Sequence, residues 1–220
     1  MTLELIDKYD GFELVRDKLA AILVAEIANQ QTLATAAGRD ADLWKIRFYL
    51  ERSNAWEQFV NIEEITDFSP ICNIWFENAT YDMSQGNTVK RQTSESLFNF
   101  DCYAVGRSAA DGTGHLAGDK EAALNAHRAA RLVRNIIMAG ENAYLGLQGT
   151  VGRRWPQNLT VLQPEMEGRS VQHIICARFT LRVHHNEVSP QYSGEIMEQI
   201  NTTIKRASDG QILVNMEFDK

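Results

Sequence analysis

The residues best suited to catalysis or metal binding are scattered along the chain, and their spacing matches no motif of either kind. The histidines are His115, His127, His173, His184 and His185. His184 and His185 are adjacent in a strand-like run, where neighbouring side chains point to opposite faces, so they cannot bind one metal ion together. The serine-hydrolase, zinc-protease and glycine-rich phosphate motifs are missing from the sequence. We therefore expect a protein that is not an enzyme and that has no catalytic residue, metal or cofactor.

The cysteines also argue against a metal site or a disulfide framework. Cys72, Cys102 and Cys176 are widely spaced, odd in number and without a CxxC pair. Each lies in an apolar run of strand type, where a cysteine is usually a small buried residue. We expect all three thiols to be buried and unpaired, as in a reducing compartment.

A group of arginines is the charge pattern that most suggests a binding surface. Arg128, Arg131 and Arg134 recur at steps of three, which places them along one side of a helix. Two interpretations stay open: a solvated helix surface opposite the core, or a contact with acidic residues of a neighbouring subunit. A DNA contact is less favoured, because the whole chain carries a formal net charge of −7.

Length, composition and charge bound the class of protein. The chain has 220 residues, 44% of them hydrophobic and 4 of them proline, so it is able to form a folded domain with a sizeable core. The formal net charge is −8 over residues 1–118 and +3 over residues 119–154. We find no signal peptide and no apolar run near the roughly 20 residues that span a bilayer. We expect synthesis in the cytoplasm and no association with a membrane.

Two stretches have apolar residues at the three- and four-residue steps of an amphipathic helix. The first covers residues 12–37, with a capping box formed by Asp10 and Glu13 at its start and Gly38 at its end. Its apolar stripe consists of Phe12, Val15, Leu19, Ile22, Leu23 and Ile27. The second covers residues 119–138, and Gly140 is expected to stop it. Its stripe, whose small residues allow close packing on a sheet, consists of Ala122, Ala126, Ala129, Val133, Ile136 and Ile137.

Period-two alternation and β-branched or aromatic residues predict five strands. They are residues 44–51, 71–80, 93–105, 159–162 and 170–184. The second and third form an antiparallel pair joined by a polar segment at residues 82–92. A turn at residues 164–169 joins the last two, and a loop at residues 108–118 precedes the second helix. The first strand is ambiguous, because a helix fits its apolar positions nearly as well.

The C-terminal residues are predicted to form an added arm. Asp209-Gly210 separates alternating runs at residues 200–207 and 211–218, which is a strong signal for a β-hairpin. The apolar face of this hairpin is expected to consist of Ile204, Ala207, Ile212, Val214 and Met216. We therefore divide the chain into an α+β domain at residues 1–187, with a mostly antiparallel sheet and two main helices, and a β-hairpin arm at residues 188–220.

The span from residue 98 to residue 187 resembles the tail terminator, or tail-completion, proteins of long-tailed bacteriophages. The resemblance rests on LFNFDCYAVG at residues 97–106, the alanine-rich helix, LGL at 145–147, RRWP at 153–156 and the strand-like run at 171–187. The order of elements over residues 1–187 agrees with it more loosely. The polar segment at 82–92 and the C-terminal arm depart from the compact family core.

The resemblance implies a structural virion protein that forms a ring, usually a hexamer, on the completed tail tube. Such a ring ends polymerisation of the tube and joins it to the neck. The implied partners are further copies of the chain, the tail tube protein, a sheath protein where the tail has one, and the neck and connector proteins. Genomic DNA would pass through the ring without sequence-specific binding.

The expected subunit-contact residues come from the arginine-rich helix and from the arm. They are Arg128, Arg131, Arg134, Ile204, Ile212, Val214 and Met216. Assembly is expected in the host cytoplasm, and the mature location is the tail or neck of the virion. Another neck or head-completion connector protein is the alternative. A soluble binding module or an enzyme is a less favoured one.

Overall fold

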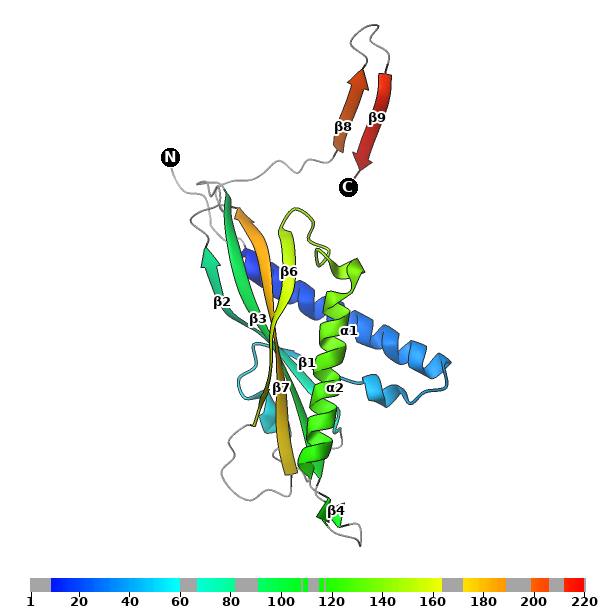
Figure 1. Ribbon diagram of the computed structural model, residues 1–220, viewed down its shortest axis with the longest axis vertical. Coiled ribbons are helices and arrows are strands. Elements are labelled where there is room, and N and C mark those ends of the chain that lie inside the picture. Colours follow the sequence, from blue (N-terminus) through cyan, green and yellow to red (C-terminus); the bar gives the residue numbers. More distant parts are fainter. Residues whose placement is uncertain are drawn as a thin grey trace. The chain divides into compact units, whose positions relative to one another are not determined.

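The computed structural model describes residues 9–59, 67–81, 91–107, 109–110, 115–116, 118–163, 172–188, 199–205 and 212–219. The chain divides into two units, of which one spans residues 8–189 and the other contains the C-terminal hairpin; each is described by itself. A five-stranded sheet in the order β1-β2-β3-β7-β6 is the centre of the larger unit (Figure 1). Its strands are β1 Arg47–Leu50, β2 Ile71–Tyr81, β3 Arg91–Arg107, β7 Gln172–Val188 and β6 Val151–Leu162. β1 runs parallel to β2, and the other neighbours are antiparallel.

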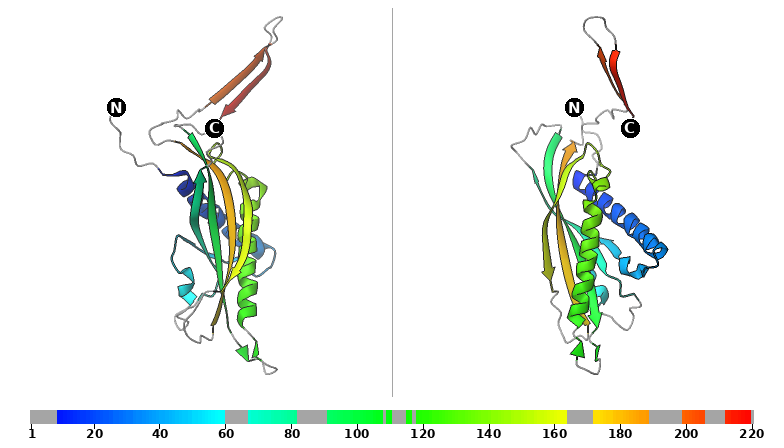
Figure 2. Two further views of the ribbon diagram at one scale, coloured as in Figure 1. Left: turned by 60° about the vertical axis from the view of Figure 1, so that its left-hand side comes forward. Right: turned by 45° about the vertical axis from the view of Figure 1, so that its right-hand side comes forward.

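Two helices, α1 (Gly11–Ala36) and α2 (Gly118–Met138), cover the same face of this sheet (Figure 2). Their buried side chains form one apolar core with the residues that alternate on that face of β2, β3 and β7. Phe98 and Phe100 of β3 and Phe179 of β7 lie in this core and are at most 1% exposed. The predicted α+β class, with a mostly antiparallel sheet and two main helices, is confirmed.

The first helix begins and ends through local hydrogen bonds that its sequence predicts. The Glu13 carboxylate accepts the backbone N–H of Asp10 at 3.0 Å, as in a capping box. At the other end Gly38 has a φ of +65°, and the N–H of Arg39 donates to the carbonyl of Ala34 at 2.9 Å. This left-handed ending satisfies carbonyl groups that the last turn leaves without partners.

The second helix packs closely on the sheet because the residues that face it are small. All six residues of the predicted stripe are buried. Gly106 near the end of β3 touches Gly118 at the start of α2, and a Cβ at Gly106 would collide with the Gly118 carbonyl oxygen. Glycine is therefore required where the chain leaves the sheet and enters the helix.

On the opposite face of the sheet, the described residues form a helix at one end only. There the short 3-10 helix η2 (Ala55–Phe59) packs Phe59 against Ile71, Val105 and Ile174. The rest of this face carries polar and charged side chains at alternate positions of β3 and β7. The sheet is therefore two-sided, with an apolar face under the helices and a polar face opposite.

Two predicted strands differ from the structure. Residues 44–51 were expected to form one strand, but Ala41–Trp44 forms the 3-10 helix η1, and β1 begins at Arg47. The Asp40 carboxylate accepts the N–H of Asp42 at 3.0 Å and so favours the turn. The strand predicted at residues 159–162 begins much earlier, at Val151, because β7 provides a partner along the whole of β6.

The end of α2 and the loop before it also differ in part. The helix ends at Met138, and Gly140 begins the 3-10 helix η4 (Gly140–Asn142) rather than stopping α2 directly. The loop predicted at 108–118 includes two short paired strands, β4 (Ala109–Ala110) and β5 (His115–Leu116). Of the segment predicted at 82–92, residues 91 and 92 belong to β3, and the others lie outside the described residues. The turn predicted at 164–169 lies outside them too.

The second unit contains the hairpin that the Asp209-Gly210 signal predicts. β8 (Gln199–Lys205) pairs antiparallel with β9 (Ile212–Asp219) as a two-stranded sheet. Ile204 is the register partner of Val214, and the register shifts between Ile204 and Lys205. Residues 206–211, which include Asp209 and Gly210, lie outside the described residues.

Candidate subunit-contact surfaces

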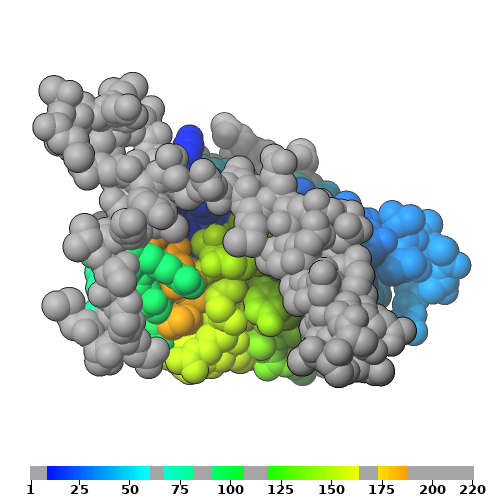
Figure 3. Space-filling model, turned by 90° about the horizontal axis from the view of Figure 1, so that it is seen from above, coloured from blue at the N-terminus to red at the C-terminus, as the bar shows by residue number. Residues whose placement is uncertain are grey.

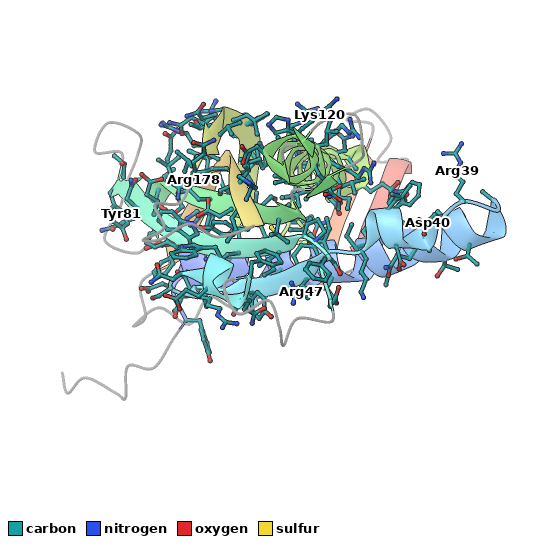
Figure 4. All side chains as sticks on the ribbon, turned by 90° about the horizontal axis from the view of Figure 1, so that it is seen from below. Arg39, Asp40, Arg47, Tyr81, Lys120 and Arg178 are labelled. Carbon is teal, nitrogen blue, oxygen red and sulfur yellow. The ribbon has the colours of Figure 1, made fainter. Side chains whose placement is uncertain are left out.

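The three arginines of α2 lie on the side of the helix that faces away from its buried stripe. Arg131 and Arg134 are exposed, whereas Arg128 is half-buried. Each step of three residues turns the side chain by about 60° around the helix axis, so the three spread across the outer surface instead of forming one cluster. Lys120 stands on the outer side of the same helix (Figure 4). The helix thus presents a broad cationic surface.

Arg128 borders a groove of about 370 Å³. The groove lies between α2 and two further segments, residues 42–46 before β1 and residues 67–70 before β2. Lys45 and Asp67 form an ion pair in the lining of this groove, with 3.0 Å between nitrogen and oxygen. Partial burial would raise the pKa of Asp67, but hydrogen bonds from Ser69 and the nearby Lys45 outweigh it and lower the pKa to about 2. Two of the charged residues that line the groove, Lys45 and Asp67, are therefore paired with each other, and Arg128 lies in a different environment from the exposed Arg131.

Acidic side chains gather at the β1–β2 end of the sheet, around the first half of α1. Phe12 stacks on Phe76 with 4.2 Å between ring centroids, which holds the first turn of α1 over β2. Arg16 bridges Asp17 and Glu51, at 2.9 and 3.4 Å. We call Asp10, Glu13, Asp17, Glu51 and Glu77 the acidic end; all but the half-buried Glu13 are exposed.

The outer surface of α2, which packs over β3 and β7, and the edge strand β6 are cationic. Residues 122–163 contain five arginines and a single carboxylate, Glu141. Arg154 of β6 donates to the carbonyls of Ile137 and Ala139, at 2.6 and 2.8 Å, and so fixes β6 beside the end of α2. We call Lys120, Arg131, Arg134 and Arg153 the basic end. In the sheet, β3 and β7 lie between β2 and β6.

A hydrogen-bonded network covers the polar face of the sheet where no helix lies. Its centre is Asp101, whose side chain is 4% exposed. Both oxygens of this carboxylate accept from Arg178, at 2.6 and 2.9 Å, and one also accepts from the indole N–H of Trp75 at 2.9 Å. The Arg178 guanidinium also lies over the Trp75 ring, 5.1 Å from its centroid. The hydrogen bond to Asp101 raises the pKa of Arg178 although burial opposes it.

The network continues along β3 and β7 beyond Asp101, and one of its bonds reaches β2. Thr180 donates to Asn99 at 2.6 Å, and Asn99 donates to Glu77 at 2.7 Å. One row further on, Arg182 donates to Glu95 at 2.9 Å. These bonds join β2, β3 and β7 across the face, so the charges there are already matched within one chain. The charged side chains of the polar face are therefore paired within the chain. By contrast, the acidic end carries mainly negative charge and the basic end mainly positive charge.

The outer edge of β6 exposes apolar side chains. Leu159, Val161 and Leu162 are 55%, 50% and 37% exposed. Within the described residues, β6 pairs with β7 and has no strand on its other side. Atoms of this part of the chain reach the surface in the space-filling view (Figure 3). An apolar strand edge of this kind is usually covered by a further strand, helix or partner.

Neither a family model nor a curated protein matches this sequence. In the described part of the chain, no helix is long and apolar enough to cross a membrane. The assignment of a function therefore depends on the residues and their geometry.

The histidine pair behaves as the strand alternation predicts. His185 is fully buried on the helix face, where its Nε2 lies 2.8 Å from the Ser96 hydroxyl. His184 is half-buried on the opposite face. Burial, together with the neighbouring His184, lowers the pKa of His185 to about 4. His185 is therefore a neutral core residue at ordinary pH.

The three cysteines are buried and free, as predicted. Cys72 and Cys102 are register partners on β2 and β3. Their contact, together with burial, raises the pKa of the Cys102 thiol well above its usual value, and burial raises the pKa of Cys176. Among the described residues, no group of three or more histidine, cysteine or acidic side chains could hold a metal ion. The absence of a metal or cofactor in the working protein stays a prediction.

The structure places the two predicted sets of contact residues in separate units. The arginines belong to α2, and Ile204, Ile212, Val214 and Met216 belong to β8 and β9. The sequence interpretation missed the Asp101 network and the exposed edge of β6. Polar residues at alternate positions of β3 and β7 were a signal for the Asp101 network. For the exposed edge of β6, Leu159 and Val161 alternate in a run without charge, but nothing marked that run as an outer strand.

Proposed function

We propose that this chain is a structural protein of a bacteriophage virion, a tail terminator that forms a ring at the head–tail junction. The observation that carries the proposal is the separation of charge between the acidic end and the basic end. The acidic end lies around α1 and β2, and the basic end lies on α2 and β6. Opposite surfaces of this kind allow each copy to bind the next head to tail, which is the contact that closes a ring.

The order of elements supports the same proposal. A long helix, an antiparallel pair of strands, a second helix and two further antiparallel strands follow one another along the chain. The bacteriophage resemblance of residues 98–187 implies this order. The polar face, with its charges already paired, suits a rigid building block more than a reacting site. In this proposal the chain acts without catalysis, and its partners are further copies, the tail tube and the neck proteins.

Electron-microscopic reconstruction tests the proposal. Purified tails that contain the chain should show a sixfold ring of it at the end nearest the head. Tails assembled without the chain should have no defined length, because the ring is what stops the tube. A ring of twelve copies, or of any symmetry other than six, would instead indicate a connector or head-completion protein. Location away from the tail end would reject both assignments.

A further inference from the structure

Part of β6 is a regular strand edge with which no further strand pairs among the residues that the structure describes. Register shifts occur between Val151 and Arg153 and between Pro156 and Asn158, and Pro156 has no N–H to donate. These features disfavour strand pairing along the first half of β6. From residue 158 to residue 162 the register with β7 is unbroken, and the exposed leucines and valine lie in this half. Residues 158–162, which we call the β6 edge, are therefore able to accept another strand.

The hairpin supplies a strand whose charge suits this edge. β8 and β9 pair with each other alone, and an isolated two-stranded sheet is at best marginally stable in water. β9 contains Glu217 and Asp219 and no basic residue, whereas β8 contains Lys205 and no acid. The β6 edge belongs to the stretch with five arginines and one glutamate. Charge complementarity therefore favours β9 as the strand that docks.

The proposed ring favours docking on another copy. A head-to-tail contact places the surface that carries β6 against a neighbouring copy, so a strand edge on that surface meets the hairpin of that copy.

We infer that β9 of one copy adds as a strand to the β6 edge of a second copy. The inference rests on the proposed ring, and it names the contact that joins its subunits in addition to their charged ends. Main-chain hydrogen bonds would provide affinity, and burial of Leu159 and Val161 would provide specificity. The hairpin would gain the third strand that it needs for stability.

Cross-linking between two forms of the full chain tests the inference. One form carries Val161→Cys and an affinity tag, and the other carries Val214→Cys or Met216→Cys. The native cysteines are buried and should not react. With a short bismaleimide, a mixed dimer should form at concentrations where copies associate. Val24→Cys replaces Val161→Cys as the control, because Val24 is similarly exposed, at 53%, but lies on α1.

Three results would overturn the inference. One is a mixed dimer that forms equally with the Val24→Cys control. Another is no mixed dimer up to the solubility limit. The third is a cross-link within single chains carrying both Val161→Cys and Val214→Cys, with none between chains, because docking would then be on the same copy. As a second measurement, Leu159→Lys with Val161→Lys should weaken self-association about tenfold or more, and Val24→Lys with Leu33→Lys should not.

The same samples separate this inference from the proposed function. Rings on tail ends without the Val161–Val214 cross-link would leave the terminator proposal standing and reject the docking of β9. A specific cross-link without rings on tails would support docking between copies and reject the terminator proposal. Hydrogen exchange gives a third reading, because the amides of residues 158–162 should become protected as the full chain associates.

Discussion

Asp101 holds long side chains in place over the polar face of the sheet. Arg178 and Trp75 donate to its carboxylate, and together they leave it almost without contact to water. These two hydrogen-bond partners replace the hydration that the carboxylate loses on burial. The network thus fixes these side chains against the strands, so that they form part of a rigid surface.

Replacing this carboxylate should destabilise the chain strongly. We predict that Asp101→Ala lowers the free energy of unfolding by about 3 kcal/mol, at the lower end of the cost of breaking a buried ion pair because Arg178 is partly exposed. Urea unfolding followed by circular dichroism measures the change. Asp17→Ala is the control, because Asp17 also pairs with an arginine but is 50% exposed, and it should cost less than about 1 kcal/mol. Equal losses for the two variants would show that the network contributes little.

His185 makes folding sensitive to acid. Its pKa is lowered from 6.5 to about 4 by burial and by His184, so the unfolded chain binds a proton at a higher pH than the folded chain. The stability that depends on neutral His185 is therefore fully present above pH 6.5, and it is lost as the pH falls towards 4. We predict a loss of about 3 kcal/mol over this window, measured by urea unfolding at several pH values.

A variant separates this histidine from other acid-sensitive groups. His185→Gln should be less stable at pH 7, and its stability should fall much less between pH 6.5 and 4. His127→Gln, at an exposed position of α2, should retain the full pH dependence of the natural chain. An unchanged pH dependence in His185→Gln would mean that other groups cause the loss.

At the scale of elements, the sequence predicts best where one physical requirement dominates. The buried stripes of α1 and α2 follow helical periodicity, and both helices were predicted to within about two residues of their observed ends. The first half of β6 has no alternation, and its Pro156 normally argues against a strand. It is a strand because β7 lies beside it and because Arg154 ties it to the end of α2. Pairing with a strand that is distant in the sequence leaves no pattern in the local sequence of β6.

The residues of the candidate surfaces also differ in how far the sequence predicts their positions. The outward position of Arg131 and Arg134 follows from spacing along one helix, which the sequence contains. The half-buried position of Arg128 depends on residues 42–46 and 67–70, which the fold brings beside α2. The Asp101–Arg178 pair joins residues 77 positions apart, so its existence requires the register of β3 and β7. Periodicity along one element does not encode that register.

The exposed arginines of α2 should matter for assembly and not for folding. Reversing Arg131 and Arg134 to Glu should change the free energy of unfolding by no more than about 0.5 kcal/mol per residue, because both are exposed. The same double variant should form fewer rings, because like charges would then meet at the acidic end of the next copy. Thermal unfolding and electron microscopy measure the two effects. Arg39→Glu, at an exposed position just beyond the C-terminal end of α1, should leave ring formation nearly unchanged. A large fall in melting temperature after reversal of the α2 arginines would place them in intramolecular packing.

At the scale of the whole molecule, the larger unit has a complete core of its own. Among the residues whose burial the structure describes, its two core clusters extend from residue 15 to residue 183. In the proposed ring, three surfaces of the molecule meet a neighbouring copy: the acidic end, the basic end and the β6 edge. Each neighbour brings opposite charge to the two ends and a strand to the edge. Head-to-tail contacts of this kind form a closed ring when the rotation between copies completes a circle.

Deletion of residues 193–220 should separate folding from assembly. We predict that the shortened chain keeps its free energy of unfolding within about 0.5 kcal/mol and loses the ability to self-associate and to cap tails. Sedimentation and urea unfolding measure the two properties. Adding the deletion to Leu159→Lys with Val161→Lys should cause no further loss of association, because both changes remove the same contact. Additive losses would mean that the hairpin docks somewhere other than the β6 edge. Aggregation, or a much lower melting temperature after the deletion, would show instead that the hairpin completes the fold of its own chain.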